Sequence, residues 1–298
     1  MELSWLTKLR IAAAAAIGVV LIGILAWPMV VPTDPFGAVC AGEISIVGKL
    51  VLVVLALLCG FLGFFVSKPY GREIGILAVP AGLAALAVRS GNMTSLLLQT
   101  QTSTERLSVY AALKWEPVFW LIVTAAGFLG VLLAGQIYKK PDANPTQQKP
   151  DSKSKVYFNA LIALVGSLFI AKFCVMIFAQ DIRWADNSLN SVLVQPTVAQ
   201  IAFAVLISFG IAAFVVKKFL DASYIWPSIA SALLTALAIN VYVKNGVFEH
   251  LVENWPVAYF SNAVLSILPI QMVAFGTIGS VAGYWLAVRY KYWRKHEF

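Results

Sequence analysis

Eight long apolar stretches are the feature that most constrains what this chain can fold into. A helix needs about 20 apolar residues to cross the roughly 30 Å hydrocarbon core of a bilayer, because each residue adds about 1.5 Å. Most of the stretches reach that length with little or no charge inside. They cover Ile11–Val31, Ile44–Val66, Ile74–Val88, Val118–Tyr138, Val156–Phe178, Val198–Val216, Tyr224–Val243 and Leu265–Tyr290. The sequence therefore predicts an all-α integral membrane protein with eight transmembrane helices.

The composition and the distribution of charge support this prediction. Hydrophobic residues make up 60% of the 298 positions and charged residues 12%, whereas about a quarter of a soluble domain is charged. If the amino terminus is cytoplasmic, most of the 22 basic residues fall on the cytoplasmic side. This positive-inside bias predicts a plasma (inner) membrane protein with both termini in the cytoplasm. The net charge of +8 is thus a topology signal, and no nucleic-acid partner is expected.

The second half of the sequence resembles the first. A Gly-x-x-Gly-x-x-x-small motif begins at Gly127 and again at Gly276, and three further matches fall in order at a nearly constant offset. The pattern predicts a 4+4 pseudo-repeat of two four-helix units. Small residues let helices approach closely. We therefore expect the following to be helix-packing positions: Gly127, Gly130, Gly276, Gly279 and Gly283.

These matches divide the chain into three parts. Residues 1–138 form the first repeat, residues 139–155 a hydrophilic linker, and residues 156–298 the second repeat. The linker is rich in Pro, Asp, Lys, Gln and Ser and cannot bury a core, so we expect a mobile cytoplasmic segment. Because each repeat has four spans, the second starts on the same side as the first. The repeats should then be parallel, related by a pseudo-twofold axis along the membrane normal.

Two short amphipathic helices are predicted on the outer side, one in each repeat. Thr102 and Glu105 have the spacing of a capping box at the start of the first helix. Asn245 is placed to cap the second, and each helix ends in a tryptophan close to a proline. Such helices fit the bilayer interface, where an indole is half wet and half apolar. The alternative is that they pack on each other as an extracellular lid.

The predicted spans lack the groups that carry proton, metal or redox chemistry. No Asp or Glu lies inside a span, which argues against acid-based coupling to protons or sodium. Both histidines, His250 and His296, lie outside the membrane, so no haem or other cofactor is expected. His250 and Glu253 share one helical face, but a metal site would need ligands from a second helix. A solvated face is the preferred interpretation, and no metal is expected.

Lys49 and Lys172 lie well inside apolar stretches, both in the outer halves of their helices. A lysine at the membrane centre costs about 2.5–3.5 kcal/mol, and less when its stem reaches the interface. Snorkelling to the surface is the preferred interpretation. The functional alternative is an outer-leaflet site for an anionic group, such as a lipid phosphate or a substrate carboxylate. Gln200 and Asn240 would add hydrogen bonds to that site, or would instead join neighbouring helices.

Arg89 closes the third apolar stretch, Ile74–Val88, which reaches only about 22 Å as a helix. A stretch this short indicates bilayer thinning, a broken helix or a snorkelling arginine. With Glu105, Arg106 and Glu116, Arg89 would line an outer polar vestibule that binds substrate. The preferred alternative is an ion pair that pins the loop, and Glu116 at a span end is expected to be solvated.

Sequence motifs assign no catalytic residue. No nucleophile elbow, phosphate loop or dinucleotide fingerprint occurs. The cysteines Cys40, Cys59 and Cys174 are scattered and are expected to be unpaired, although a Cys40–Cys174 bridge is geometrically conceivable.

Three function classes remain open. The first is a permease or channel-like conduit for a small or lipidic solute, with membrane lipids as partners. It predicts polar residues that converge between the halves. The second is a non-catalytic scaffold, assembly factor or subunit that binds other membrane subunits or a second copy of itself, with a dry interior. The third, an enzyme on lipid-linked substrates at the outer face, is not the expected one.

Overall fold

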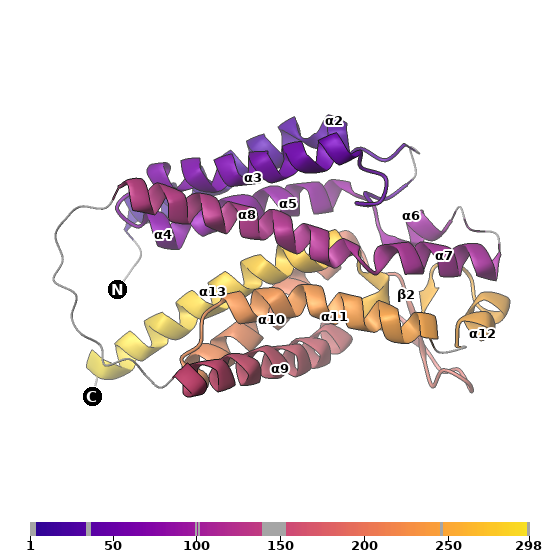
Figure 1. The fold of residues 1–298 in the computed structure, drawn as a ribbon. Coiled ribbons are helices and arrows are strands. Elements are labelled where there is room, and N and C mark those ends of the chain that lie inside the picture. Colours follow the sequence, from indigo (N-terminus) through magenta and orange to yellow (C-terminus); the bar gives the residue numbers. More distant parts are fainter. Residues whose placement is uncertain are drawn as a thin grey trace.

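The computed structural model describes residues 4–33, 37–98, 100, 102–138, 153–244 and 247–296. Among these residues, eight helices are long and apolar enough to cross a membrane, which confirms the predicted number of spans. The long helices lie side by side in two layers (Figure 1). One layer comes from residues 4–138 and the other from residues 153–296, which we call the first and second halves. Most of the predicted linker lies outside the described residues.

Each half contains four of the long helices, joined by shorter elements. The first half contains α1 (Trp5–Gly18), the π-helix η1 (Val19–Leu25), α2 (Trp27–Val30), α3 (Ile46–Val66), α4 (Gly71–Ile74), the 3-10 turn η2 (Gly75–Leu77), α5 (Ala78–Arg89), α6 (Met93–Leu97), α7 (Ser103–Leu113) and α8 (Glu116–Ile137). The second half contains α9 (Lys153–Phe178), β1 (Arg183–Trp184), β2 (Val192–Val194), α10 (Val198–Leu220), α11 (Ile225–Lys244), α12 (Val247–Asn254), β3 (Tyr259–Phe260), the 3-10 turn η3 (Ala263–Ser266) and α13 (Pro269–His296).

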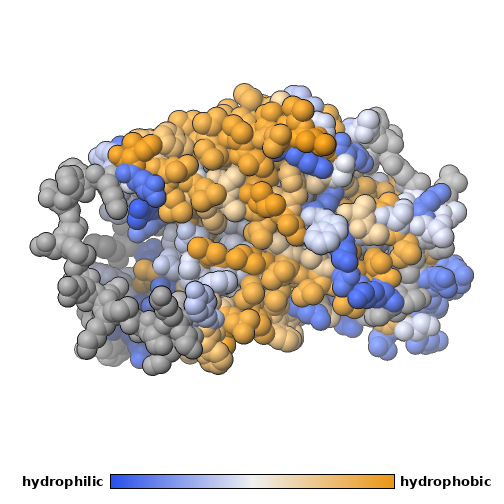
Figure 2. Space-filling view, viewed as in Figure 1, coloured by the Kyte–Doolittle hydropathy of each residue, from blue (hydrophilic) through white to orange (hydrophobic). Residues whose placement is uncertain are grey.

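The surface of the bundle changes character along its length. Figure 2 shows apolar residues across the middle of the visible face and hydrophilic residues towards both ends. α1 begins and α13 ends at one end of the bundle, which we call the terminal end (Figure 1). The opposite end carries α6, α7, α12 and the strands, and we call these elements the cap. An apolar belt between two polar ends is the surface expected of a bundle that crosses a bilayer.

Side-chain caps fix where helices begin. The Ser45 hydroxyl accepts a hydrogen bond from the N–H of Gly48 at 3.0 Å and starts α3. At the start of α7, Thr102 and Glu105 form the predicted capping box, in which each side chain accepts from the backbone N–H of the other residue.

The third span is longer than its apolar stretch suggests. α4 and η2 precede α5, so the helical run covers Gly71–Arg89, 19 residues. At about 1.5 Å per residue this run measures about 28 Å, close to the thickness of the hydrocarbon core. The helical run extends beyond the apolar stretch at both ends, and the 3-10 turn η2 interrupts its α-helical part near the start.

In the first half, α8 packs directly on the backbone of α3. A Cβ atom added at Gly130 would lie 2.1 Å from the carbonyl oxygen of Leu57, and one added at Gly60 would lie 1.9 Å from that of Gly127. A carbon atom cannot lie this close to a carbonyl oxygen, so a residue with a side chain does not fit at either position. The two helices touch backbone to backbone, which a close crossing in a membrane requires.

In the second half, α13 packs on α10 in the same way. A Cβ at Gly279 would lie 2.2 Å from the carbonyl oxygen of Leu206, and one at Gly283 would lie 2.0 Å from that of Gly210. The fifth predicted packing glycine, Gly276, faces α11, where the Cβ of Ser231 lies 2.7 Å from the added atom.

The two halves meet mainly where α5 packs on α13. These two helices have the largest buried fractions among the spans. Both helices carry fully buried apolar side chains, which include Leu83 and Leu86 on α5 and Val273 and Ala274 on α13. Towards the cap, Gln271 of α13 adds a polar contact by donating to the carbonyl of Gly91 at 3.1 Å.

The cap contains a small antiparallel sheet that the sequence analysis did not predict. Its described strands lie in the order β1-β2-β3, with Leu193 between Arg183 and Phe260 in register. Gln195 follows β2 and joins the halves, because its side chain accepts from the N–H of Thr94 at 3.1 Å.

α7 belongs to the first half but is anchored on the second. The side chain of Arg106 is buried and donates to the carbonyls of Val257 and Tyr259, both at 3.4 Å. One turn later the Tyr110 hydroxyl, also buried, donates to the carbonyl of Leu265 at 3.5 Å. These bonds fix the cap across the junction of the two halves.

Replacing Gly279 by alanine is expected to lower the unfolding free energy by about 1–3 kcal/mol, because the added methyl group collides with a backbone carbonyl that cannot rotate away. Thermal unfolding in detergent measures the effect. Gly166→Ala in α9 is the matched control, since nothing lies within 4 Å of its added Cβ. The unfolding free energy of the control should equal that of the parent or exceed it by up to about 1 kcal/mol, because alanine has a higher helix propensity than glycine. Equal stability of the two variants would contradict the close crossing.

Candidate functional site

A groove of about 530 Å³ lies between α9 and α11 and is bounded towards the cap by the segment that leads into η3. This volume falls in the range of about 300–1,000 Å³ that is typical of small-molecule sites. Most of the lining is aliphatic or aromatic, with these side chains contributing: Leu168, Phe169, Leu234, Leu237, Val241 and Val264. The groove is therefore suited to a hydrocarbon chain.

The groove opens sideways onto the apolar belt. Phe169 on α9 is 71% exposed, and Leu237 on α11 is 51% exposed, although both line the groove. In a bilayer, side chains exposed at this level face lipid tails. A molecule dissolved in the membrane can therefore enter without crossing water.

Four polar side chains that can donate hydrogen bonds line the groove together with the apolar ones. Lys172 comes from α9, Tyr242 comes from α11, and Ser261 and Asn262 come from the segment between β3 and η3. The Asn262 side-chain oxygen accepts from the N–H of Val264 at 3.0 Å, which leaves its NH₂ group as the donor. No Asp or Glu is among the described lining residues, so the groove carries a positive charge.

The structure places one of the five predicted substrate-binding residues in this groove, Lys172. Lys49 is half-buried on α3, in the other half of the molecule. Asn240 is half-buried on α11 but is not among the lining residues. Gln200 joins neighbouring helices, since its side chain donates to the carbonyl of Gln180 at 2.7 Å, just beyond the end of α9.

Arg89 binds the first helix. Its guanidinium donates to the carbonyl of Gly23 at 3.1 Å and lies 4.0 Å from the centre of the Trp27 ring. Gly23 lies in η1, where the π-helical pattern disturbs the usual bonding of backbone carbonyls. Arg89 thus provides a donor to a carbonyl of the irregular helix and stacks on the indole of Trp27 in α2.

The other residues of the predicted vestibule have different partners. Arg106 binds carbonyls near β3, and Glu105 takes part in the capping box of α7. Glu116 accepts from the N–H of Gly42 at 3.4 Å. Its expected solvation was wrong, because the residue is only 4% exposed. The loop before α3 covers the start of α8, and Cys40 from that loop is buried as well.

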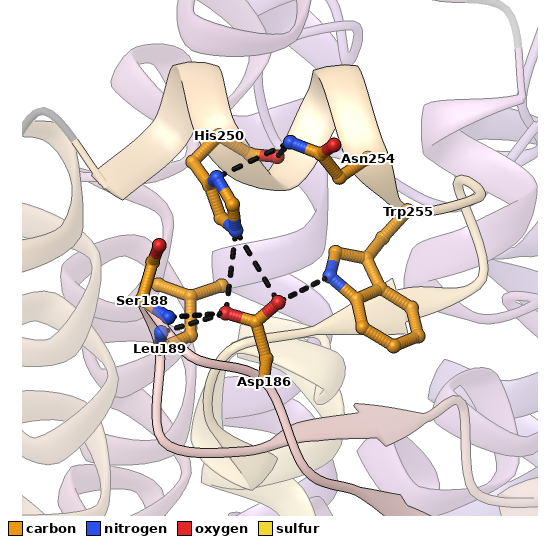
Figure 3. Close-up of polar contacts among 6 residues, drawn as sticks. All are labelled: Asp186, Ser188, Leu189, His250, Asn254 and Trp255. Atoms are coloured by element: carbon orange, nitrogen blue, oxygen red, sulfur yellow. Dashed lines mark hydrogen bonds and ion pairs between the residues drawn. The ribbon is translucent and has the colours of Figure 1, made fainter.

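A polar cluster in the cap was also missed, and Figure 3 shows it. Asp186, in the turn between β1 and β2, accepts from the backbone N–H groups of Leu189 at 2.8 Å and Ser188 at 2.9 Å. From the neighbouring helix and its end, His250 Nε2 lies 3.2 Å and Trp255 Nε1 3.1 Å from the carboxylate. One carboxylate therefore holds its own turn and clamps α12 against the sheet.

This cluster corrects the interpretation of His250 as part of a solvated face. Its second ring nitrogen lies 3.2 Å from the side-chain nitrogen of Asn254, so both ring nitrogens have partners. The backbone N–H of Leu189, followed by His250 and Trp255, lowers the pKa of Asp186 to about 2. Among the described residues, no group of three or more His, Cys, Asp or Glu side chains is placed to hold a metal ion. The cluster is a structural clamp.

Only part of this cluster has a sequence signal. Asp186-Asn-Ser188 is a typical turn sequence, in which an aspartate side chain accepts from backbone two or three residues later. Its pairing with His250 and Trp255 joins segments more than 60 residues apart, which no local pattern predicts.

None of the protein-family models, curated proteins and solved structures that were compared with the chain matches it. We therefore infer function from the geometry of the described residues.

Asp186→Asn is expected to loosen the cap. The ring N–H groups of His250 and Trp255 both donate to the negatively charged carboxylate, and the neutral amide of asparagine binds them more weakly. Hydrogen exchange in α12, corrected for intrinsic rates, should be faster than in the parent at pH 7. Since the pKa of Asp186 falls from 3.8 to about 2 on folding, its stabilising contribution is complete above pH 4 and is lost as the pH falls towards 2. The difference between variant and parent should shrink over that interval.

Asp181→Asn is the matched control for this experiment. Asp181 lies in the same loop region and is exposed, so its replacement should leave exchange in α12 unchanged. If the two variants exchange alike, Asp186 does not clamp the cap.

Proposed function

We propose that this polytopic membrane protein takes up an amphipathic, lipid-like molecule from the bilayer into the groove between α9 and α11, as a permease or conduit for lipidic solutes. One observation carries the proposal. The groove combines an apolar lining, a volume of about 530 Å³ and an opening onto the apolar belt. A water-soluble solute would have no apolar surface to bury there, whereas a hydrocarbon chain would gain from every side chain that it covers.

The orientation of the groove follows from the distribution of charge. The terminal end carries a group of basic side chains: Lys68, Arg72, Lys217, Lys218, Arg289 and Lys291. By the positive-inside rule we assign this end to the cytoplasm and the cap to the outer side of the plasma (inner) membrane. The groove, which lies towards the cap, then opens in the outer leaflet. On the same assignment, α7 and α12 serve as a lid held by the clamp at Asp186.

We also propose that the two halves arose by duplication and form a parallel 4+4 repeat. Two equivalent contacts support this proposal. Gly130 meets the carbonyl of Leu57, and Gly279, at the same place in the second motif, meets the carbonyl of Leu206. In each half the fourth span thus packs on the second through the same position of the motif.

The packing between the halves bears on the route of a conduit. α5 and α13, which meet at the junction, carry buried apolar side chains such as Leu86 and Val273. The polar groups expected along a pathway between the halves lie instead at the cap, where Gln271 and Gln195 bind backbone groups. We therefore propose that the lipidic solute moves along the groove in the second half.

A scaffold or subunit is the second candidate. The packed junction of the halves favours it, and so does the exposed flank of α9, where Phe158, Phe169 and Phe173 are 63%, 71% and 67% exposed. A flank of this kind suits another membrane subunit or a second copy of the chain as well as it suits lipid. An enzyme at the outer face would need a cluster of polar residues around one cavity. Four of the candidates bind separate partners instead, so we propose no catalytic role: Arg89, Glu105, Glu116 and His250.

Leu237→Trp tests the proposed function by filling the groove with a bulky indole. We expect native mass spectrometry of the gently solubilised variant to show at least about tenfold less retained lipid than the parent, because the ligand loses the space for its chain. Leu233→Trp is the matched control. It lies one turn earlier on α11, is 36% exposed and does not line the groove.

Equal lipid retention by the two variants would contradict the proposal. A stoichiometric complex with other membrane chains, without retained lipid in the parent, would favour the scaffold.

A further inference from the structure

We infer that the polar part of the groove binds the phosphate of an anionic membrane lipid, with Lys172, Ser261 and Asn262 as its ligands. This inference rests on the proposed function and adds the chemical class of the headgroup.

The charge of the groove is the first argument. Lys172 lies inside an apolar stretch of α9 and is exposed there, and no ion pair or hydrogen bond joins it to another described residue. The described lining contains no carboxylate that could neutralise it. An ammonium group in hydrocarbon is costly unless an anion or water reaches it. An anionic headgroup that enters with its chain supplies that partner.

The kind of donor is the second argument. The ammonium group of Lys172, the hydroxyl of Ser261 and the NH₂ group of Asn262 can all donate hydrogen bonds to a ligand. The side-chain oxygen of Asn262 is already used by the N–H of Val264, which fixes the amide so that its donors remain available. A phosphate offers several acceptor oxygens and full negative charge, and charge-assisted bonds to it are strong. A zwitterionic headgroup would bring a cation towards Lys172 and is disfavoured.

The position of the donors relative to the apolar lining is the third argument. Lys172 lies one turn beyond Leu168 on α9, and Ser261 and Asn262 directly precede the buried residues of η3. A headgroup held by these donors leaves its chain beside Leu234 and Leu237. The site therefore matches a molecule with one charged end and one apolar end.

The matched pair Lys172→Gln and Lys49→Gln tests the inference. Both lysines lie inside apolar stretches, but Lys49 is on α3 and outside the groove. The proteins are placed in nanodiscs of phosphatidylcholine with a minor fraction of phosphatidylglycerol, and the lipids that survive extraction are measured by native mass spectrometry. We expect the parent and Lys49→Gln to retain phosphatidylglycerol preferentially. In Lys172→Gln, the ratio of retained phosphatidylglycerol to phosphatidylcholine should be about tenfold lower than in the parent.

Two further variants keep the test independent of folding. Lys172→Arg preserves the charge and should keep the preference. Asn262→Asp preserves the oxygen that accepts from Val264 but replaces two donors by a negative charge, so it should reduce the preference as well.

The outcomes separate this inference from the proposed function. If Leu237→Trp abolishes lipid retention while Lys172→Gln keeps the preference for phosphatidylglycerol, the headgroup assignment is wrong and the groove remains the binding site. If oleate displaces phosphatidylglycerol at equal concentration, the site selects carboxylates, and the phosphate assignment is also wrong. If Leu237→Trp retains lipid like the parent, the proposed function itself fails.

Discussion

Direct contact between helix backbones is the interaction on which the rest of the structure depends. In each half, glycines allow the fourth span to lie against the second: Gly130 of α8 meets α3, and Gly279 of α13 meets α10. Lipid tails are as apolar as leucine side chains, so helices in a membrane associate through such close packing and through polar bonds. With α10 held against α13, α9 packs across α10 and α11. The groove lies along the outer edge of this arrangement.

Several polar bonds that join the two halves lie towards the cap. Arg106, Gln195 and Gln271 each connect the first half to the second, and each uses backbone groups near the cap. Backbone groups outside regular helices need such partners, since a buried group without one is costly. The side chains that satisfy the irregular segments are therefore the same side chains that join the halves.

Apolar length could be read from the sequence, and long-range pairing could not. The spans, the capping box at Thr102 and the position of Lys172 inside an apolar stretch depend on residues close together in the chain. The burial of Glu116 depends on a loop more than 70 residues earlier, and the pairing of His250 with Asp186 joins two cap segments. The sheet escaped prediction because its strands have only two or three residues each. The groove could not be predicted from the sequence because its lining comes from three separate segments.

The bonds that cross the cap also restrict how the protein can move. An alternating-access cycle in which one half rocks against the other would have to break the contacts of Arg106 with Val257 and Tyr259 and that of Gln195 with Thr94. It would also separate α5 from α13, the most buried helices of the bundle. Entry and exit of a ligand through the lateral opening of the groove would require neither of these changes. On the proposed function, the halves would behave as one rigid body while the lipidic ligand enters and leaves beside α9 at the rate of side-chain and lipid motion.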